Sequence, residues 1–273
     1  MKINDKSFFN MPMALIKTGL KLVLCDRGMF ITDFFLATTL PFLVQYLVWS
    51  YVYNSRGIES ISGYSYVTTI TYYALAILIG RFNNGYVVIT KNANEIHEGQ
   101  LELRMARPFT LYQKNFFEFL GESLLYIIPV VISIIVCAVV CFKSIYLNPL
   151  FWILLILQLV LSQFLIFNLS WILAGSTIWL VRGFFMANLL AAFQSFFGGE
   201  LLPVAFWPSW LIPILKYNPF YFINGAIIDS FLHGNEIVLI TNCFYTLAYA
   251  CVLFFIGKVV WSCGLKKYSG AGG

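Results

Sequence analysis

The sequence predicts an all-α integral membrane protein with six transmembrane helices, and two observations support this fold class. Apolar residues make up 60% of the 273 positions and charged residues only 11%, whereas soluble domains are about 45–50% apolar and about 25% charged. Long uncharged runs, including 34–55 and 144–181, reach or exceed the roughly 20 residues that a spanning helix needs. They are too long for barrel strands and do not alternate with period two. Composition therefore excludes a soluble enzyme, a disordered chain and a disulfide-rich secreted module.

The charges and helix breakers place the elements in order. Residues 7–27 predict an amphipathic helix in the membrane interface, with a solvated lead-in carrying two snorkelling lysines as the alternative. The predicted spans cover about 28–51, 64–88, 116–141, 149–173, 183–200 and 237–260. Gly175-Ser176-Thr177 predicts a break after the fourth span.

The stretch 198–235 is apolar and aromatic but contains four prolines, so one continuous spanning helix is excluded. A re-entrant helical hairpin at the outer face before the last span is expected. A seventh and an eighth full span are the alternative.

The distribution of lysine and arginine predicts the orientation. With the N-terminus in the cytoplasm, thirteen of the 17 Lys and Arg residues fall on the inner side and three on the outer side. Cytoplasmic loops carry such an excess, so both termini are expected inside. The net charge of +5 then reflects contact with anionic lipid and indicates no nucleic-acid partner.

Four charged residues fall within or at the edge of predicted spans, where an isolated charge is costly: Asp33, Arg81, Glu118 and Glu122. Counting residues from the inner ends of their spans puts them at similar depth. We predict that Arg81 pairs with Asp33 or with one of the glutamates. The cluster could fix helix packing, form a gate or substrate contact, or relay protons.

Neither the histidines nor the cysteines indicate a metal site. His97 and His233 fall in loops on opposite sides of the predicted membrane. The six cysteines show no CxxC spacing and lie in or beside apolar spans, where they serve as small packing residues. No bound metal is expected.

The segment 89–115 is the longest and most charged predicted cytoplasmic connection. Asn92 or Asn94 could cap a short helix with Glu95 and Glu98 in its first turns, and Gly99 would end or kink it. Such a helix is suited to docking a soluble partner. A merely solvated loop is the alternative.

Two motifs resemble the ABC-2-type transporter permeases, in particular the short permeases that work in pairs. The first runs from Gly99-Gln100-Leu101-Glu102-Leu103 to Arg107-Pro108. The second runs from Phe197-Gly198-Gly199 through Leu202-Pro203, Phe206-Trp207-Pro208 and Tyr217-Asn218-Pro219-Phe220 to Gly234. The resemblance covers the whole chain in hydropathy and about 50 residues in motif. Glu200 departs from it, because such permeases usually place a small or apolar residue there.

The resemblance implies an exporter of the bacterial cytoplasmic membrane. Two identical or similar permeases would pair with a cytoplasmic ABC ATPase dimer, with residues 91–104 as the coupling helix. This chain has no G-x-x-x-x-G-K-[ST] loop, so ATP and Mg²⁺ are expected on the partner. The implied ATPase-coupling residues are Glu95, Ile96, Glu98, Gly99, Leu101, Glu102 and Arg104. The implied outer-gate residues are Gly198, Gly199, Pro203, Trp207, Pro208 and Pro219.

Two other functions remain open at this stage. A gradient-driven secondary transporter could use Asp33 or Glu122 as carrier groups, although no inverted repeat or midplane helix break is evident. A membrane enzyme or an assembly scaffold is the third possibility, but no nucleophile or metal cluster stands out. The aromatic, neutral spans favour an amphipathic substrate, whose identity the sequence does not determine.

Overall fold

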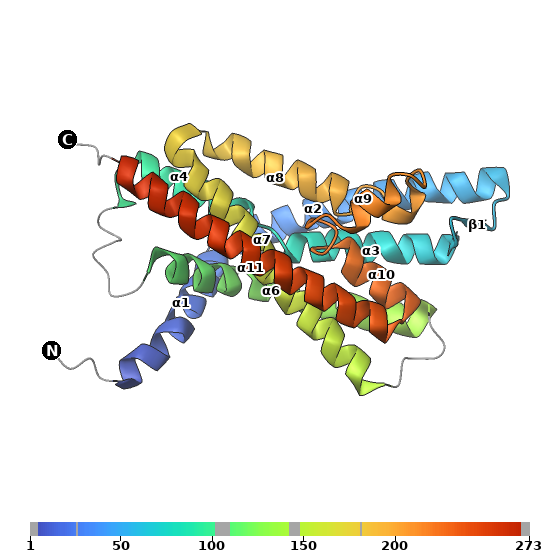
Figure 1. Ribbon diagram of the computed structural model, residues 1–273. Helices are drawn as coiled ribbons and strands as arrows, with labels where there is room; N and C mark the ends of the chain where they lie inside the picture. Colours follow the sequence, from blue (N-terminus) through green and yellow to red (C-terminus); the bar gives the residue numbers. More distant parts are fainter. Residues whose placement is uncertain (1–4, 26, 102–109, 142–147, 181, 269–273) are drawn as a thin grey trace.

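The computed structural model describes residues 5–25, 27–101, 110–141, 148–180 and 182–268. It is an elongated helical bundle in which most of the long helices run along one axis (Figure 1). The helices are α1 (Asp5–Cys25), α2 (Arg27–Arg56), α3 (Tyr66–Phe82), α4 (Tyr86–His97), α6 (Leu111–Cys141), α7 (Pro149–Leu180), α8 (Gly183–Phe197), α9 (Ile212–Lys216), α10 (Gly225–His233) and α11 (Glu236–Lys267). A two-residue antiparallel pair, β1 (Ser60–Ile61) and β2 (Tyr64–Ser65), and a 3-10 turn, η1 (Val204–Phe206), complete the described elements.

Four of the described helices are long and apolar enough to cross a membrane: α2, α6, α7 and α11. The helices α3 and α8 have 17 and 15 residues, or about 25 Å and about 22 Å at 1.5 Å per residue, which is short for a hydrocarbon core of about 30 Å. The all-helical membrane class is therefore confirmed. The count of six spans stays a prediction.

The predicted second span, 64–88, is interrupted. The helix α3 ends at Phe82, and the backbone N–H of Asn83 bonds to the carbonyl of Ile79 at 2.8 Å. Asn84 then accepts a hydrogen bond from the backbone N–H of Tyr86 at 3.1 Å, where α4 begins. Short polar side chains that bond to the nearby backbone end one helix and start another, so a single helix over 64–88 is wrong.

The predicted break at Gly175-Ser176-Thr177 is also wrong, because α7 continues to Leu180. The hydroxyls of Ser176 and Thr177 donate to carbonyls one turn back within the helix, at 2.7 and 2.6 Å, so both polar groups are satisfied without a break in α7. Gly175 serves helix packing instead. A methyl group there would lie 2.8 Å from the indole nitrogen of Trp261, so the missing side chain lets α11 approach α7 closely.

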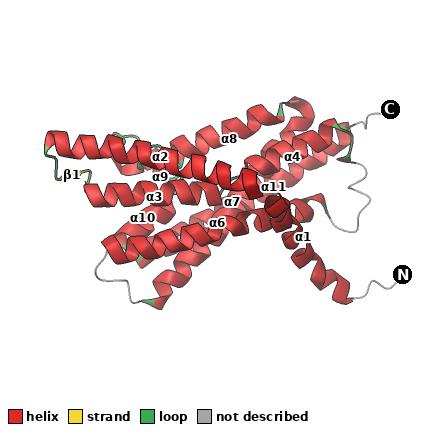
Figure 2. Ribbon diagram, turned by 180° about the vertical axis from the view of Figure 1, so that it is seen from behind, coloured by secondary structure: helices red, strands yellow, loops and turns green. Residues whose placement is uncertain are grey.

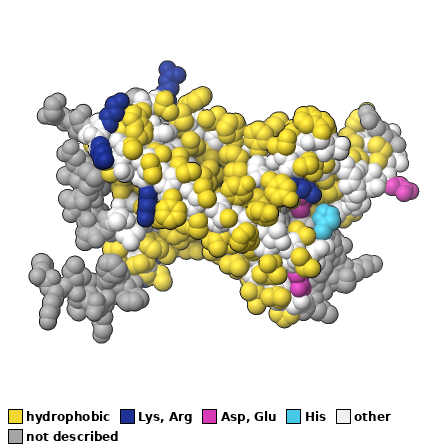
Figure 3. Space-filling model, viewed as in Figure 1, with side chains coloured by type: hydrophobic (Ala, Val, Ile, Leu, Met, Phe, Trp, Pro, Cys, Tyr) yellow, Lys and Arg dark blue, Asp and Glu magenta, His cyan; other side chains and the backbone are white. Residues whose placement is uncertain are grey.

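The two ends of the bundle differ in charge. The C-terminal end of α11 lies near α4 at one end, and the β1–β2 turn lies near the other (Figure 1). Dark-blue Lys and Arg side chains gather mainly around the first of these ends on the visible face (Figure 3), and we call it the basic end. Seen from behind, α1 projects away from the bundle toward that end (Figure 2).

The core has two parts. One buried cluster lies among α4, α7, α8 and α11 and is centred on aromatic residues such as Phe167 and Trp171. The other lies among α3, α6, α7 and α10 and includes Tyr72 and Phe231. Apolar residues of the segment between α8 and α11 contribute to both clusters. The segment contains three short helical elements, none of them long enough to span a membrane. This agrees with the exclusion of a full helix, while entry of this segment into the membrane stays a prediction.

Candidate functional site

The predicted coupling segment forms α4, which packs against α7 and α8. One face of α4 is buried and includes Val88, Ile89 and Ala93, while Asn94 and His97 are exposed. The close fit to α8 depends on Gly183, because a methyl group there would lie 2.2 Å from Cβ of Ala93. The helix is therefore held rigidly along one side.

The expected coupling residues divide into two groups. Glu95, Ile96 and Leu101 are buried within this chain, so they support α4 and do not present a surface. Glu98 is exposed, and the adjacent Gly99 has φ of +70° in the turn that follows the helix. Glu102 and Arg104, together with Leu103, Arg107 and Pro108 of the first motif, lie outside the described residues.

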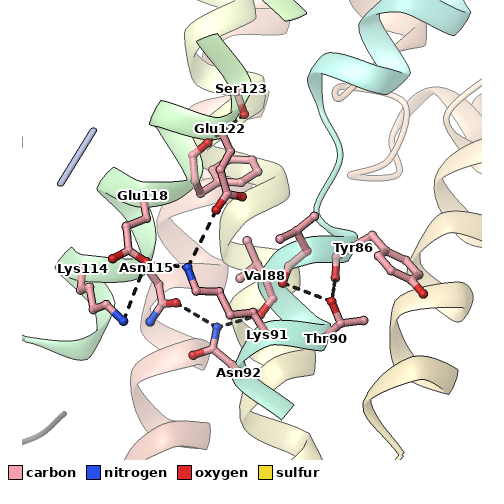
Figure 4. Close-up of polar contacts among 12 residues, drawn as sticks. Tyr86, Val88, Thr90, Lys91, Asn92, Lys114, Asn115, Glu118, Glu122 and Ser123 are labelled. Atoms are coloured by element: carbon pink, nitrogen blue, oxygen red, sulfur yellow. Dashed lines mark hydrogen bonds and ion pairs between the residues drawn. The ribbon is translucent and has the colours of Figure 1, made fainter. Parts of the chain in front are cut away.

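A charged cluster joins α4 to α6. Lys91 Nζ lies 2.6 Å from Glu118 Oε2 and 3.9 Å from Glu122 Oε1, and Figure 4 shows Lys91 pointing at both. Lys114 Nζ lies 3.8 Å from Glu118 Oε2. The side chain of Glu118 is only 7% exposed, so its charge depends on these lysines.

Sequence reasoning missed Lys91 as the partner of the glutamates, because residues 89–115 were expected to be a cytoplasmic connection and only charges within or at the edge of predicted spans were considered as partners. The following residue strengthens the joint, since Asn92 Nδ2 donates to Asn115 Oδ1 on α6 at 3.0 Å. The available signal was the spacing of Lys114, Glu118 and Glu122 along one face of α6, which indicated a charged stripe that needs a partner.

Arg81 forms its ion pair with Asp33 of α2. The guanidinium carbon also lies 5.9 Å from the centre of the Tyr126 ring on α6, within cation–π range. The four predicted intramembrane charges thus belong to two separate groups of ion pairs. Arg81 and Asp33 join α3 to α2, whereas Glu118 and Glu122 join α6 to Lys91.

Both groups border one cavity of about 530 Å³ between α1, α3, α4 and α6. Its lining includes Arg81, Lys91 and Glu122 together with apolar side chains such as Phe82 and Phe119. The cavity is therefore amphipathic, with cationic, anionic and aromatic surfaces at short range. A ligand with both a polar and an apolar part would match it.

The amphipathic helix α1 forms one wall of this cavity and crosses α6 with their backbones in contact. A methyl group at Gly19 would lie 2.0 Å from the carbonyl oxygen of Glu118, and one at Gly121 would lie 2.1 Å from that of Ile16. Small residues permit such close approach of helices in membranes. The backbone contact holds α1 directly beside Glu118.

The second motif shapes the outer segment. Gly199 adopts φ of +84°, and its carbonyl accepts a hydrogen bond from Tyr72 of α3 at 2.9 Å. The carbonyl of Gly198 accepts from the backbone N–H of Gly225 at 2.9 Å. Pro203 precedes the 3-10 turn η1. These contacts bring residues from both ends of the segment together.

The remaining predicted outer residues pack around this core. The ring of Trp207 lies 5.0 Å from that of Phe196 on α8 in an edge-to-face contact. Pro208 opens the turn into α9, and its carbonyl accepts from the N–H of Leu211 at 2.9 Å. Pro219 follows Asn218, whose side chain accepts from the N–H of Tyr221 at 3.1 Å.

A family model described as ABC-2 family transporter protein matches residues 39–272. The chain belongs to this family. It is therefore an ABC-2 permease, a multi-pass membrane component of an ABC transporter. No match was found among curated proteins.

In the ABC-2 permease, a buried polar centre links the α3–α4 break to the outer segment. Asn83 Nδ2 donates to the carbonyl of Ile223 at 2.8 Å, and Asn83 Oδ1 accepts from Gln163 Nε2 at 2.9 Å. Gln194 of α8 donates to the Asn83 carbonyl at 3.1 Å. Sequence reasoning missed this centre. The signal was the presence of glutamines and asparagines inside otherwise apolar runs.

A second missed group lies at the opposite end of the permease from the basic end. Tyr64 and Tyr221 each donate a hydroxyl hydrogen bond to the carboxylate of Asp229, at 2.7 Å. Burial raises the pKa of Asp229, while the two tyrosine hydrogen bonds act in the opposite direction. Asp229 therefore joins the α2–α3 turn to α10.

Glu200, the departure from the motif, packs against α3. Its carboxylate accepts a hydrogen bond from Ser195 at 3.0 Å. A methyl group at Gly80 would lie 3.1 Å from this carboxylate. Glu200 therefore lies directly beside the residue that precedes Arg81, and the missing side chain of Gly80 leaves room for it in the permease.

Proposed function

We propose that this chain is the membrane-spanning subunit of an ATP-driven exporter in the bacterial cytoplasmic membrane. It would pair with a second identical or similar permease and with a dimer of cytoplasmic ATPases that bind ATP and Mg²⁺. The observation that supports this proposal is α4, a short helix near the basic end with one face fixed in the bundle and with Asn94, His97 and Glu98 exposed. The positive-inside rule directs that end to the cytoplasm.

The contacts of α4 would allow a partner that binds this helix to move the neighbouring helices. Lys91 and Asn92 attach it to α6, and the close approach at Gly183 attaches it to α8. A displacement of α4 by a partner would therefore move α6 and α8 together, since packed helices shift as units. The same movement would reshape the cavity, because Lys91 and Glu122 both line it.

The cavity supports an amphipathic substrate. It combines charged side chains with apolar and aromatic ones within about 530 Å³, which is within the usual range for small-molecule sites. In the proposed cycle the substrate enters from the membrane or from the cytoplasmic side and leaves past the outer segment around Gly199. Closure of the ATPase dimer would drive this step.

Co-expression with a candidate ABC ATPase, which we expect a neighbouring reading frame to encode, tests the proposal. The tagged permease should capture the ATPase and stimulate its hydrolysis in nanodiscs. Glu98→Lys reverses an exposed charge on the α4 tip and should lower that stimulation by about tenfold, the effect of about 1.4 kcal/mol lost at an interface. Glu59→Lys, the same reversal at an exposed site near the β1–β2 turn, is the matched control and should have no effect.

Two results would contradict this function. One is failure of the full-length permease to bind any P-loop ATPase while it remains folded and monodisperse. The other is ion-gradient-driven uptake by the purified chain alone, which would establish the secondary transporter in its place.

A further inference from the structure

A second cavity, of about 590 Å³, lies among the start of α6, α7 and the C-terminal half of α11. None of its lining residues borders the cavity described above. Aromatic rings form much of its wall: Tyr112, Trp171, Phe254 and Trp261. Among the described residues that line it, Lys258 is the one charged side chain.

The aromatic wall is already assembled. Trp171 and Trp261 stack with ring centres 4.2 Å apart, and the Trp261 indole N–H donates to the Trp171 carbonyl at 2.8 Å. Tyr112 meets Phe254 edge to face at 5.1 Å. The rings therefore support one another and form a preassembled aromatic wall.

Lys258 has no anionic partner in the described part of the chain. Its Nζ lies 4.4 Å from the centre of the Phe254 ring and 5.9 Å from that of Phe255, and no carboxylate of those residues lies within 4 Å of it. Its side chain is exposed. A cation beside an apolar groove, flanked by the rings of Phe254 and Phe255, is complementary to a negative group attached to an apolar chain.

The depth of Lys258 identifies the membrane level. It follows Glu236, the first residue of α11, by 22 positions, or about 33 Å along the helix axis. This distance slightly exceeds the roughly 30 Å of a hydrocarbon core. Lys258 therefore falls at the headgroup boundary at the basic end, and Phe254 lies one turn deeper.

We propose that this groove, lined by Lys258 and the four aromatic residues, binds an anionic phospholipid of the adjoining leaflet. The lipid phosphate would contact Lys258 with the headgroup region beside the Trp171–Trp261 stack, and an acyl chain would extend along Phe254, one turn deeper. Basic pockets between membrane helices at an interface are suited to such headgroups. The proposal is independent of substrate transport, because it concerns a different cavity.

Native mass spectrometry of the full-length protein with added phosphatidylglycerol or phosphatidylcholine of identical acyl chains tests this site. The wild type should retain phosphatidylglycerol in preference. Lys258→Gln should reduce that retention by about fivefold, since a lysine near the surface contributes about 1 kcal/mol toward anionic lipid, and Lys258→Arg should preserve it. Lys267→Gln, the same charge loss on an exposed position of the same helix, should leave retention unchanged.

A second variant tests the contribution of the groove separately from the charge of Lys258. Ser262 also lines this groove, so Ser262→Trp fills the cavity while keeping Lys258, and it should reduce retention of both lipids. Equal retention of the two lipids by the wild type, unchanged retention in Lys258→Gln, or displacement of the lipid by millimolar inorganic phosphate would overturn the proposal.

Discussion

Replacing Lys91 with methionine removes the cation that lies 2.6 Å from Glu118 Oε2 and leaves that carboxylate 7% exposed. Breaking a buried ion pair from one side costs about 3–5 kcal/mol. Lys114 Nζ remains 3.8 Å from the same oxygen, and Lys91 itself is 25% exposed. Both facts reduce the cost, and we expect a loss of about 2–3 kcal/mol in the free energy of unfolding.

The measurement is SDS titration of the protein in mixed micelles, with helical content as the signal. Lys91→Met/Glu118→Gln removes the uncompensated charge together with its partner, so it should recover at least half of the loss. Lys17→Met, at an exposed position of α1, should stay within about 0.5 kcal/mol of the wild type. A single variant as stable as the wild type, or a double variant no better than the single one, would refute the reasoning.

Three further predictions follow from the same structure. Arg81→Asp should destabilise the protein by about 1 kcal/mol, and adding Asp33→Arg should restore its melting temperature; a double variant that melts no higher than the single one would contradict the pair. Gly121→Ala should cost about 1–3 kcal/mol by overpacking against the α1 backbone, whereas Gly28→Ala, where nothing lies within 4 Å, should be silent in the same titration. Because burial raises the pKa of Asp229, the folded state binds its proton more tightly, so stability should fall as pH rises from the ordinary aspartate pKa through the raised one. Asp229→Asn should flatten that part of the pH–stability curve, and an unchanged curve would show that the carboxyl does not contribute.

The sequence predicted the presence of a helix wherever a long run of residues is almost entirely apolar. The spans that became α2, α6, α7 and α11 are long apolar runs, and the predicted bounds for the last, 237–260, fall inside Glu236–Lys267. Such runs have one stable form in lipid, because only a helix bonds its own backbone groups. The break at 83–85 was missed because two asparagines in an apolar stretch do not reveal which distant carbonyls they will bond.

The candidate site was predictable only in part. Charged residues in apolar runs are costly, so Asp33, Arg81, Glu118 and Glu122 could be singled out from sequence. Their grouping could not, since it depends on which helices lie next to each other. Lys91 reaches the glutamates because the break after α3 places α4 beside α6, and Glu95 is buried because α4 packs against α7 and α8.

By itself, the sequence determined that this protein lies in a membrane, that it is helical and that its two ends differ in charge. It also contains the motifs that resemble those of ABC-2 permeases. These properties depend on composition and on neighbours along the chain. Only the tertiary structure decided the ion-pair partners, the two cavities and the junction of Asp229 with Tyr64, whose residues lie 165 positions apart. Hydrogen bonds and ion pairs act over a few ångströms, so their partners are determined by packing in three dimensions and not by separation along the chain.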